Sequence, residues 1–224
     1  MTRAAAALNW RPEWPVTAIV GAAWSAAIVL QVIGNHRLHT SPPLVAWSIM
    51  TLLMMVPVTL PAIRYLAFNS FRSRRSRAMA IYVVVYLLAW LAFGVFAMKL
   101  VSIAGLVGMT RPALAIVTLF AAAAWQLTPR RRRALLSCRR AVPLPPSGWR
   151  ADAACARFAV QQAQHCMMVC WPVMLLMAVV GHQLFAMIVL TALVTAEEQA
   201  PWRERLFAPM AVAFLATAVV IAAG

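Results

Sequence analysis

Apolar runs of about 20 residues recur along the whole chain, and they constrain its fold more than any other feature. A helix needs about 20 apolar residues to cross the roughly 30 Å hydrocarbon core of a bilayer. Of the 224 residues, 64% are hydrophobic and only 11% are charged, whereas soluble domains carry about a quarter charged residues. We therefore predict an all-α, polytopic transmembrane helix bundle that forms a single domain over residues 1–224.

Seven apolar segments predict about seven membrane spans. Their bounds are 14–34, 44–66, 78–104, 110–127, 157–180, 182–197 and 205–223. The first lacks a small-residue cleavage site followed by a soluble domain, so we expect a retained helix instead of a signal peptide. The sixth is short, so the region 157–197 holds either two full spans or a re-entrant pair.

The distribution of basic residues predicts the orientation of these spans. Seventeen of the 20 Lys and Arg residues lie in the segments 1–13, 64–78, 128–157 and 197–206. Cytoplasmic loops of membrane proteins carry such an excess. We predict an N-terminus inside, a multi-pass location in the bacterial inner membrane and a basic cytoplasmic loop at 128–156. The loops suit anionic lipid headgroups, and we expect no nucleic-acid partner, because the aromatic and fold signals of such modules are missing.

Signatures of enzymes are missing from the sequence. There is no GxSxG, no Gly-rich phosphate loop with Lys, no HExxH and no pair of carboxylates inside a predicted span. All five acidic residues lie near predicted span ends on the cytoplasmic side, where we expect Glu197 to cap a helix or pair with inner arginines. We predict a protein that is not an enzyme, with thiol redox activity left open.

The stretch QHCMMVCWPVM, residues 164–174, carries four sulfur side chains within five residues. Residues three and four apart share a helix face. One stripe is therefore expected to hold Gln162, Cys166, Cys170, Met174 and Met177, with His165 at its edge. Pro172 cannot donate to the carbonyl of Met168, which predicts a kink and a freed carbonyl beside the two thiols, available to a ligand or water.

A second sulfur-rich stretch, WSIMTLLMMVPVTLP at 47–61, lies in the second apolar segment. One face is predicted to carry Trp47, Met50, Met54, Pro57 and Pro61, with Met55 adjacent. At about 1.5 Å per residue, Met54 lies roughly 16 Å below the outer end of its helix. By the same rule Cys166 and Cys170 lie roughly 13 and 20 Å from the inner end of theirs. Both groups thus fall near the bilayer midplane.

Thiolate and thioether ligands select Cu(I) over Mg, Ca or Mn. We predict copper as the bound metal, held by residues drawn from Cys166, Cys170, Met50, Met54, Met55, Met174, His165 and His182. The motif HRLH (His36 and His39) and His182 are candidates for gathering metal at an outer mouth. The alternatives are that the sulfur residues are ordinary apolar packing and that the loop histidines are solvated.

Three segments together resemble a bacterial membrane family of unknown function that is catalogued as predicted metal-binding integral membrane proteins. The second-span stretch is similar to its Trp-x-x-Met…Met-Met-x-Pro-x-x-x-Pro pattern, WQLTPRRRRALLSCR (125–139) to Gln-Leu-Thr-Pro…Cys-x-x-Cys-Arg, and HCMMVCWPVM to Cys-x-Gly-Cys-Cys-Trp-x-x-Met. Glu197 with Pro201 resembles Glu-Lys-x-x-Pro. The departures are Leu135, Met168 and Val169, which replace two cysteines and a glycine, and Gly181–Leu184, which replaces Gly-x-Met-Asn.

Two functions remain open from the sequence. The first is an integral membrane protein that binds or moves a soft metal ion through Met and Cys side chains near the midplane. The second is a non-enzymatic accessory or assembly subunit with protein partners in a larger membrane complex. Small-residue runs such as AAAA (121–124) favour close helix packing of that kind.

Overall fold

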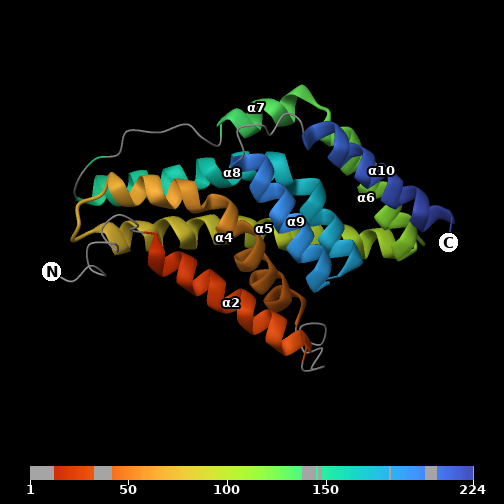
Figure 1. Ribbon diagram of the computed structural model, residues 1–224, viewed down its shortest axis with the longest axis horizontal. Coiled ribbons are helices and arrows are strands. Elements are labelled where there is room, and N and C mark those ends of the chain that lie inside the picture. Colours follow the sequence, from red (N-terminus) through yellow and green to blue (C-terminus); the bar gives the residue numbers. More distant parts are fainter. Residues whose placement is uncertain are drawn as a thin grey trace.

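The computed structural model describes residues 13–32, 42–137, 145, 148–181, 183–199 and 206–223, and these ranges hold eight helices and no strand (Figure 1). The helices are α2 (Trp14–Val32), α4 (Pro43–Phe68), α5 (Arg75–Leu106), α6 (Arg111–Gln126), α7 (Pro129–Ser137), α8 (Trp149–Val180), α9 (Leu184–Gln199) and α10 (Phe207–Ala223). The predicted all-α class is confirmed.

Each of the seven predicted apolar segments overlaps one helix, with two differences in the basic region. The first is α7, a short helix rich in arginine that the search for apolar runs passed over. The second is that α8 begins at Trp149 instead of at 157. Gly148, with φ of 79°, precedes it, and Asp152 lies in the first turn, where a negative charge favours the helix dipole. A polar sequence can thus extend a helix beyond its apolar part.

Three helices, α4, α5 and α8, are each long and apolar enough to cross a membrane. The pair α6 and α7 passes the same test together, but the two helices are bent by 72° at the break between them. The apolar stretches Trp14–Val29 and Phe207–Ala223 are shorter. Length and composition thus support three spans, or up to four, while the count of seven and the inside N-terminus stay predictions.

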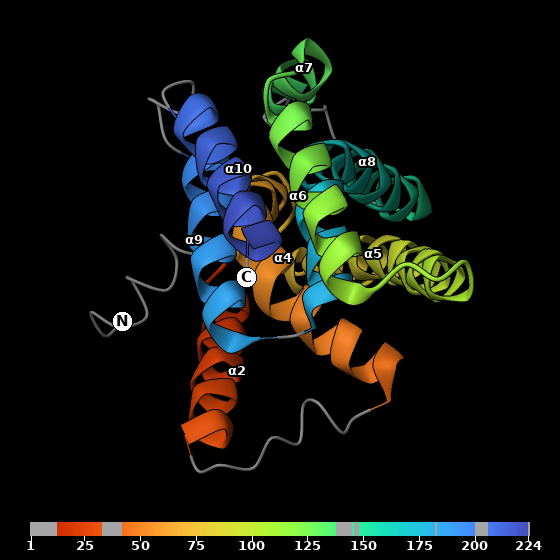
Figure 2. The ribbon, with the colours of Figure 1, turned by 90° about the vertical axis from the view of Figure 1, so that its right-hand side faces the viewer.

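Helix α5 packs against both α4 and α8, and α8 in turn packs against α6. On the other sides, α9 packs on α4, and α10 runs along α6 (Figure 2). The short α7 lies against α8. Large side chains of the three long helices fill the core, and the fully buried ones include Trp47, Met54, Tyr82, Tyr86, Trp90 and Met174.

Two contacts fix the antiparallel register of α4 and α5. The indole of Trp47 lies on Gly94, where a Cβ atom would stand 2.1 Å from Nε1, and it donates a 3.0 Å hydrogen bond to the carbonyl of Trp90. Farther along, the hydroxyls of Thr59 and Tyr82 are hydrogen-bonded. Position 47 therefore lies opposite position 94, and position 59 lies opposite position 82. The number of residues between the two contacts is the same on both helices. The same register brings Met55 to the level of Tyr86.

The prolines inside α4 and α8 free backbone carbonyls that side chains from other helices then bind. Pro57 frees the carbonyl of Leu53, to which Trp24 of α2 donates its indole N–H over 3.0 Å. Pro61 frees that of Pro57, which accepts from Gln199 of α9 over 3.4 Å. An unpaired carbonyl in an apolar core is costly, so these bonds attach neighbouring helices to α4 at defined depths.

Candidate metal centre

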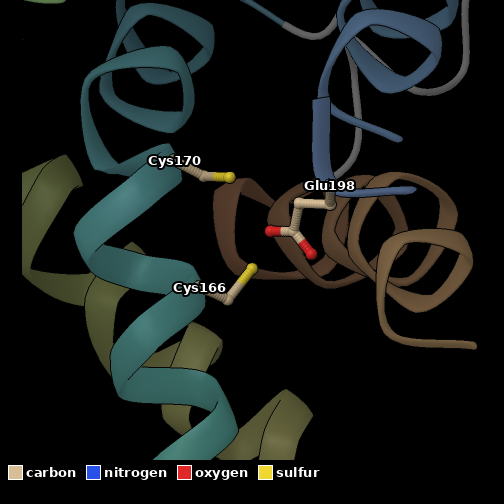
Figure 3. A group of neighbouring side chains, drawn as sticks. All are labelled: Cys166, Cys170 and Glu198. Atoms are coloured by element: carbon tan, nitrogen blue, oxygen red, sulfur yellow. The ribbon is translucent and has the colours of Figure 1, made fainter. Parts of the chain in front are cut away.

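Two thiols of α8 and one carboxylate of α9 meet inside the core. The ligand atoms of Cys166, Cys170 and Glu198 all lie within 4.8 Å of one another. The residues are 1%, 1% and 8% exposed, respectively. Figure 3 shows both sulfur atoms pointing from α8 toward the carboxylate of Glu198. Three donor groups of metal-ligand type thus converge away from solvent.

The helix period places both sulfurs on the same face of α8. The predicted stripe is confirmed, because Gln162, Cys166, Cys170, Met174 and Met177 are all buried. Both cysteines are free thiols, on consecutive turns of the helix. A one-turn spacing orients two ligands in parallel, so a single ion could bind both sulfurs without any rearrangement of the backbone.

The hydroxyl of Tyr86 reaches the first of these thiols from α5. It donates a 3.1 Å hydrogen bond to Sγ of Cys166, and its ring stacks on that of Tyr82 with centroids 5.9 Å apart. A hydrogen bond to a ligand atom from a second residue orients that ligand and tunes its basicity. Tyr86 is therefore placed to orient the thiol of Cys166, and the sequence did not single it out.

The carbonyl of Met168, between the two cysteines, is not available as predicted. Pro172 does leave it without its helical donor, but the indole N–H of Trp125 on α6 donates to it over 2.8 Å. The rings of Trp125 and Trp171 also lie edge to face, with centroids 5.5 Å apart. The freed carbonyl thus joins α8 to α6, and the prediction that it serves as an extra ligand or water site is wrong on this point.

Next to the cluster, a second carboxylate is engaged in a buried ion pair. Glu197 is 0% exposed and lies 2.6 Å from Nη2 of Arg131 on α7. Gln126, at the end of α6, donates to its other oxygen over 2.5 Å. The prediction that Glu197 pairs with an inner arginine is confirmed. The run of four arginines at 130–133 is therefore not uniform, because Arg131 points inward while its neighbours are exposed.

The predicted methionine ligands all lie in the same buried core as the two thiols. Met50, Met54, Met55 and Met174 are at most 1% exposed. The register of α4 and α5 puts Met55 level with Tyr86, whose hydroxyl binds Cys166. That the two sulfur-rich stretches form one site near the bilayer midplane stays a prediction.

The histidines do not join the three-residue cluster within the described part of the chain. His165 is half-buried on α8, one position before Cys166, and is not a member of the group. His182, His36 and His39 lie outside the described residues, so the predicted outer-mouth site stays a prediction. Among the described residues, sulfur and carboxylate, not imidazole, make up the candidate centre.

Glu198 was missed from the sequence because it follows Glu197 at the cytoplasmic end of an apolar run, where acids normally face water. A signal was nevertheless present. Met187, Thr191, Val194 and Glu198 follow one another at spacings of four, three and four, and all are buried. An acidic residue that continues the apolar stripe of its helix belongs to the core, and a buried carboxylate is paired with a cation, bound to a metal or protonated.

The two thiols of the donor set fit a soft metal ion, whereas the Glu198 carboxylate is a harder ligand. Two thiols on one helix face suit Cu(I), and thioether sulfur is a ligand of the same soft type. Zinc also accepts thiolate and carboxylate but gains little from methionine. The sulfur-rich surroundings of this cluster therefore favour copper.

Fold and cluster together define a class of protein: apolar, all-helical, with a buried set of thiol and carboxylate donors in its core. The profile of a copper-chaperone family, PpoB2, matches residues 44–221. The chain belongs to that family. The matched range runs from the first turn of α4 into α10 and includes every member of the cluster. Searches of curated proteins and of solved structures found no match.

Proposed function

We propose that the protein is an integral membrane copper chaperone that holds one Cu(I) ion between Cys166 and Cys170. The observation that carries this proposal is the convergence of two thiols and the Glu198 carboxylate within 4.8 Å in the buried core. Membership of a copper-chaperone family supports the choice of ion. Met54, Met55 and Met174 are the proposed sources of thioether ligands around the two thiols.

The chemistry follows from burial. A thiol binds metal as the thiolate, so loading with Cu(I) releases protons. Two thiolates in an apolar core are stable only with a cation between them, because an isolated charge there costs many kcal/mol. A site of this kind binds Cu(I) firmly while it is closed and shields the ion from water. Release to a recipient would require α8 and α9 to separate, and we propose a partner protein that receives the ion.

We further propose that α2, α6, α9 and α10 cross the bilayer together with α4, α5 and α8, with the N-terminus inside. The arginine distribution supports this orientation. In it, α7 lies at the inner surface, where its exposed arginines meet anionic headgroups. The bend of 72° between α6 and α7 agrees with a helix that leaves the membrane and turns along its surface.

The test is Cu(I) affinity measured anaerobically on purified protein by competition with a chromophoric Cu(I) chelator. Wild type is compared with C166S/C170S and with C155S, which removes another free, buried thiol of α8 outside the cluster. We expect one high-affinity Cu(I) per chain in wild type and C155S and its loss in C166S/C170S. Equal affinity in all three proteins would remove these cysteines from the proposal.

A further inference from the structure

Three consecutive residues at the end of α9 contact three different parts of the bundle. Glu197 binds Arg131 of α7 over 2.6 Å. Glu198 lies with the two thiols of α8, and Gln199 donates to the carbonyl of Pro57 on α4 over 3.4 Å. Successive side chains on a helix point about 100° apart, so the direction of one of these residues determines that of the next.

Arg131 links both halves of the candidate centre. Its Nη2 binds Glu197, next to Glu198, and its Nε donates over 3.4 Å to the carbonyl of Val169, next to Cys170. The side chain is 3% exposed. Its guanidinium also lies 5.4 Å from the centre of the Phe207 ring on α10. The side chain of Arg131 thus connects the turn of α8 that carries the cysteines with the end of α9 that carries the two glutamates.

The bend between α6 and α7 delivers this arginine to the interior. Thr128 accepts a hydrogen bond from the backbone N–H of Arg131 over 3.4 Å at the start of α7. In α7 the buried positions are Arg131, Ala134 and Leu135, at helical spacing, so the inward face of the helix begins with the arginine. Gln126, the last residue of α6, binds the same carboxylate as Arg131.

We propose that Arg131 and Glu197 are positioning residues that hold Glu198 beside Cys166 and Cys170 as a third ligand for Cu(I). This inference rests on the proposed function. A buried ion pair is weak evidence for stability, because desolvation offsets much of its attraction. Groups behind a metal ligand, in contrast, orient it, and their loss typically lowers metal affinity about 10- to 100-fold. Two contacts favour the second role: Glu197 is adjacent to Glu198 on α9, and Arg131 binds the carbonyl of Val169, which is adjacent to Cys170 on α8.

The experiment uses R131Q/E197Q, which removes both charges and leaves neither one uncompensated in the core. Its matched control is R133Q, at an exposed arginine of the same helix. Cu(I) affinity is measured by chelator competition in the full-length protein, and we expect a loss of about 10- to 100-fold for the pair and none for the control. The R131Q/E197Q substitutions are then introduced into an E198A background. There we expect no further loss of Cu(I) affinity, because the side chain that Arg131 and Glu197 position is absent.

The outcomes separate the two proposals. If R131Q/E197Q lowers Cu(I) affinity equally with and without Glu198, it acts through general packing, and the positioning role is overturned. Wild-type affinity in R131Q/E197Q also overturns that role. Copper binding that is the same in C166S/C170S as in wild type overturns the proposed function itself. If R131Q/E197Q does not fold, E197D carries the same test, since it keeps the charge and shortens the reach. It must lower affinity in wild type but not in E198A.

Discussion

The hydroxyl of Tyr86 on α5 donates a 3.1 Å hydrogen bond to Sγ of Cys166 on α8. This bond joins the two halves of the core, because α5 is also held in register with α4 by the Trp47 and Tyr82 contacts. The bond thus connects the thiols of α8, through α5, to the helix that carries the buried methionines. The position of Tyr86 beside the candidate metal centre therefore depends on how closely α4 and α5 pack.

That dependence predicts a large effect of a single methyl group at Gly94. The Cβ of G94A would stand 2.1 Å from Nε1 of Trp47, so the helices must move apart or the buried indole must turn. Overpacking of this kind costs about 1–3 kcal/mol. We expect a lower thermal midpoint for G94A in detergent. The control is G105A on the same helix, where a Cβ meets nothing within 4 Å; a similar loss in both variants would contradict the tight contact.

Breaking the Arg131–Glu197 pair from one side should be costly. R131A leaves the carboxylate of Glu197, which is 0% exposed, without its cation. Removal of one partner from a buried pair costs roughly 3–5 kcal/mol. R133A, at an exposed position, should change stability by less than about 0.5 kcal/mol. Chemical denaturation followed by circular dichroism compares the two, and equal midpoints would show that the pair is not desolvated as described.

The role of the methionines is tested by removal of sulfur at nearly constant shape. M54L/M55L keeps the volume of the core, so it should fold normally, yet it deletes two proposed thioether ligands. We expect Cu(I) affinity to fall about tenfold, or roughly 1.4 kcal/mol. M98L, at a half-buried position on α5, should bind as wild type does. Unchanged affinity in M54L/M55L would assign these methionines to packing alone.

The proposed orientation of the helices predicts which loops a reagent reaches from outside the cell. In a C155S/C138S background, M109C lies between α5 and α6, and S137C lies at the end of α7. A membrane-impermeant maleimide should label M109C in intact cells and S137C only after the membrane is opened. Labelling of S137C in intact cells would contradict the inside N-terminus.

The sequence predicted the elements and the sulfur stripes because both follow from local periodicity. A span must be a long apolar run, and residues four apart on a helix must share a face, so Cys166 and Cys170 could be placed on one buried stripe without coordinates. The helix α7 was not predicted, because its arginines break the apolar pattern, although its buried residues have helical spacing. A helix of nine residues gains its stability from packing, which sequence periodicity alone does not reveal.

The contacts of the site depend on tertiary packing and could not be predicted from the sequence. Nothing in the sequence indicates that the hydroxyl of Tyr86 would donate to Cys166. Nor does it indicate that Trp125 would donate to the carbonyl of Met168, which Pro172 frees. Glu197 and Glu198 look alike in sequence, yet one binds Arg131 and the other lies with the thiols. The difference is a rotation of one residue about the axis of α9, which only the neighbouring helices decide.

The most direct test of the central claim is the copper content of protein purified anaerobically from copper-supplied cells. Elemental analysis should find about one copper per chain in wild type and in C155S, since we propose that the ion binds at the Cys166–Cys170–Glu198 cluster. C166S/C170S, shown to be folded by its helical circular dichroism, should contain only traces. Equal copper in C166S/C170S and wild type, or wild-type protein that carries none, would contradict the account.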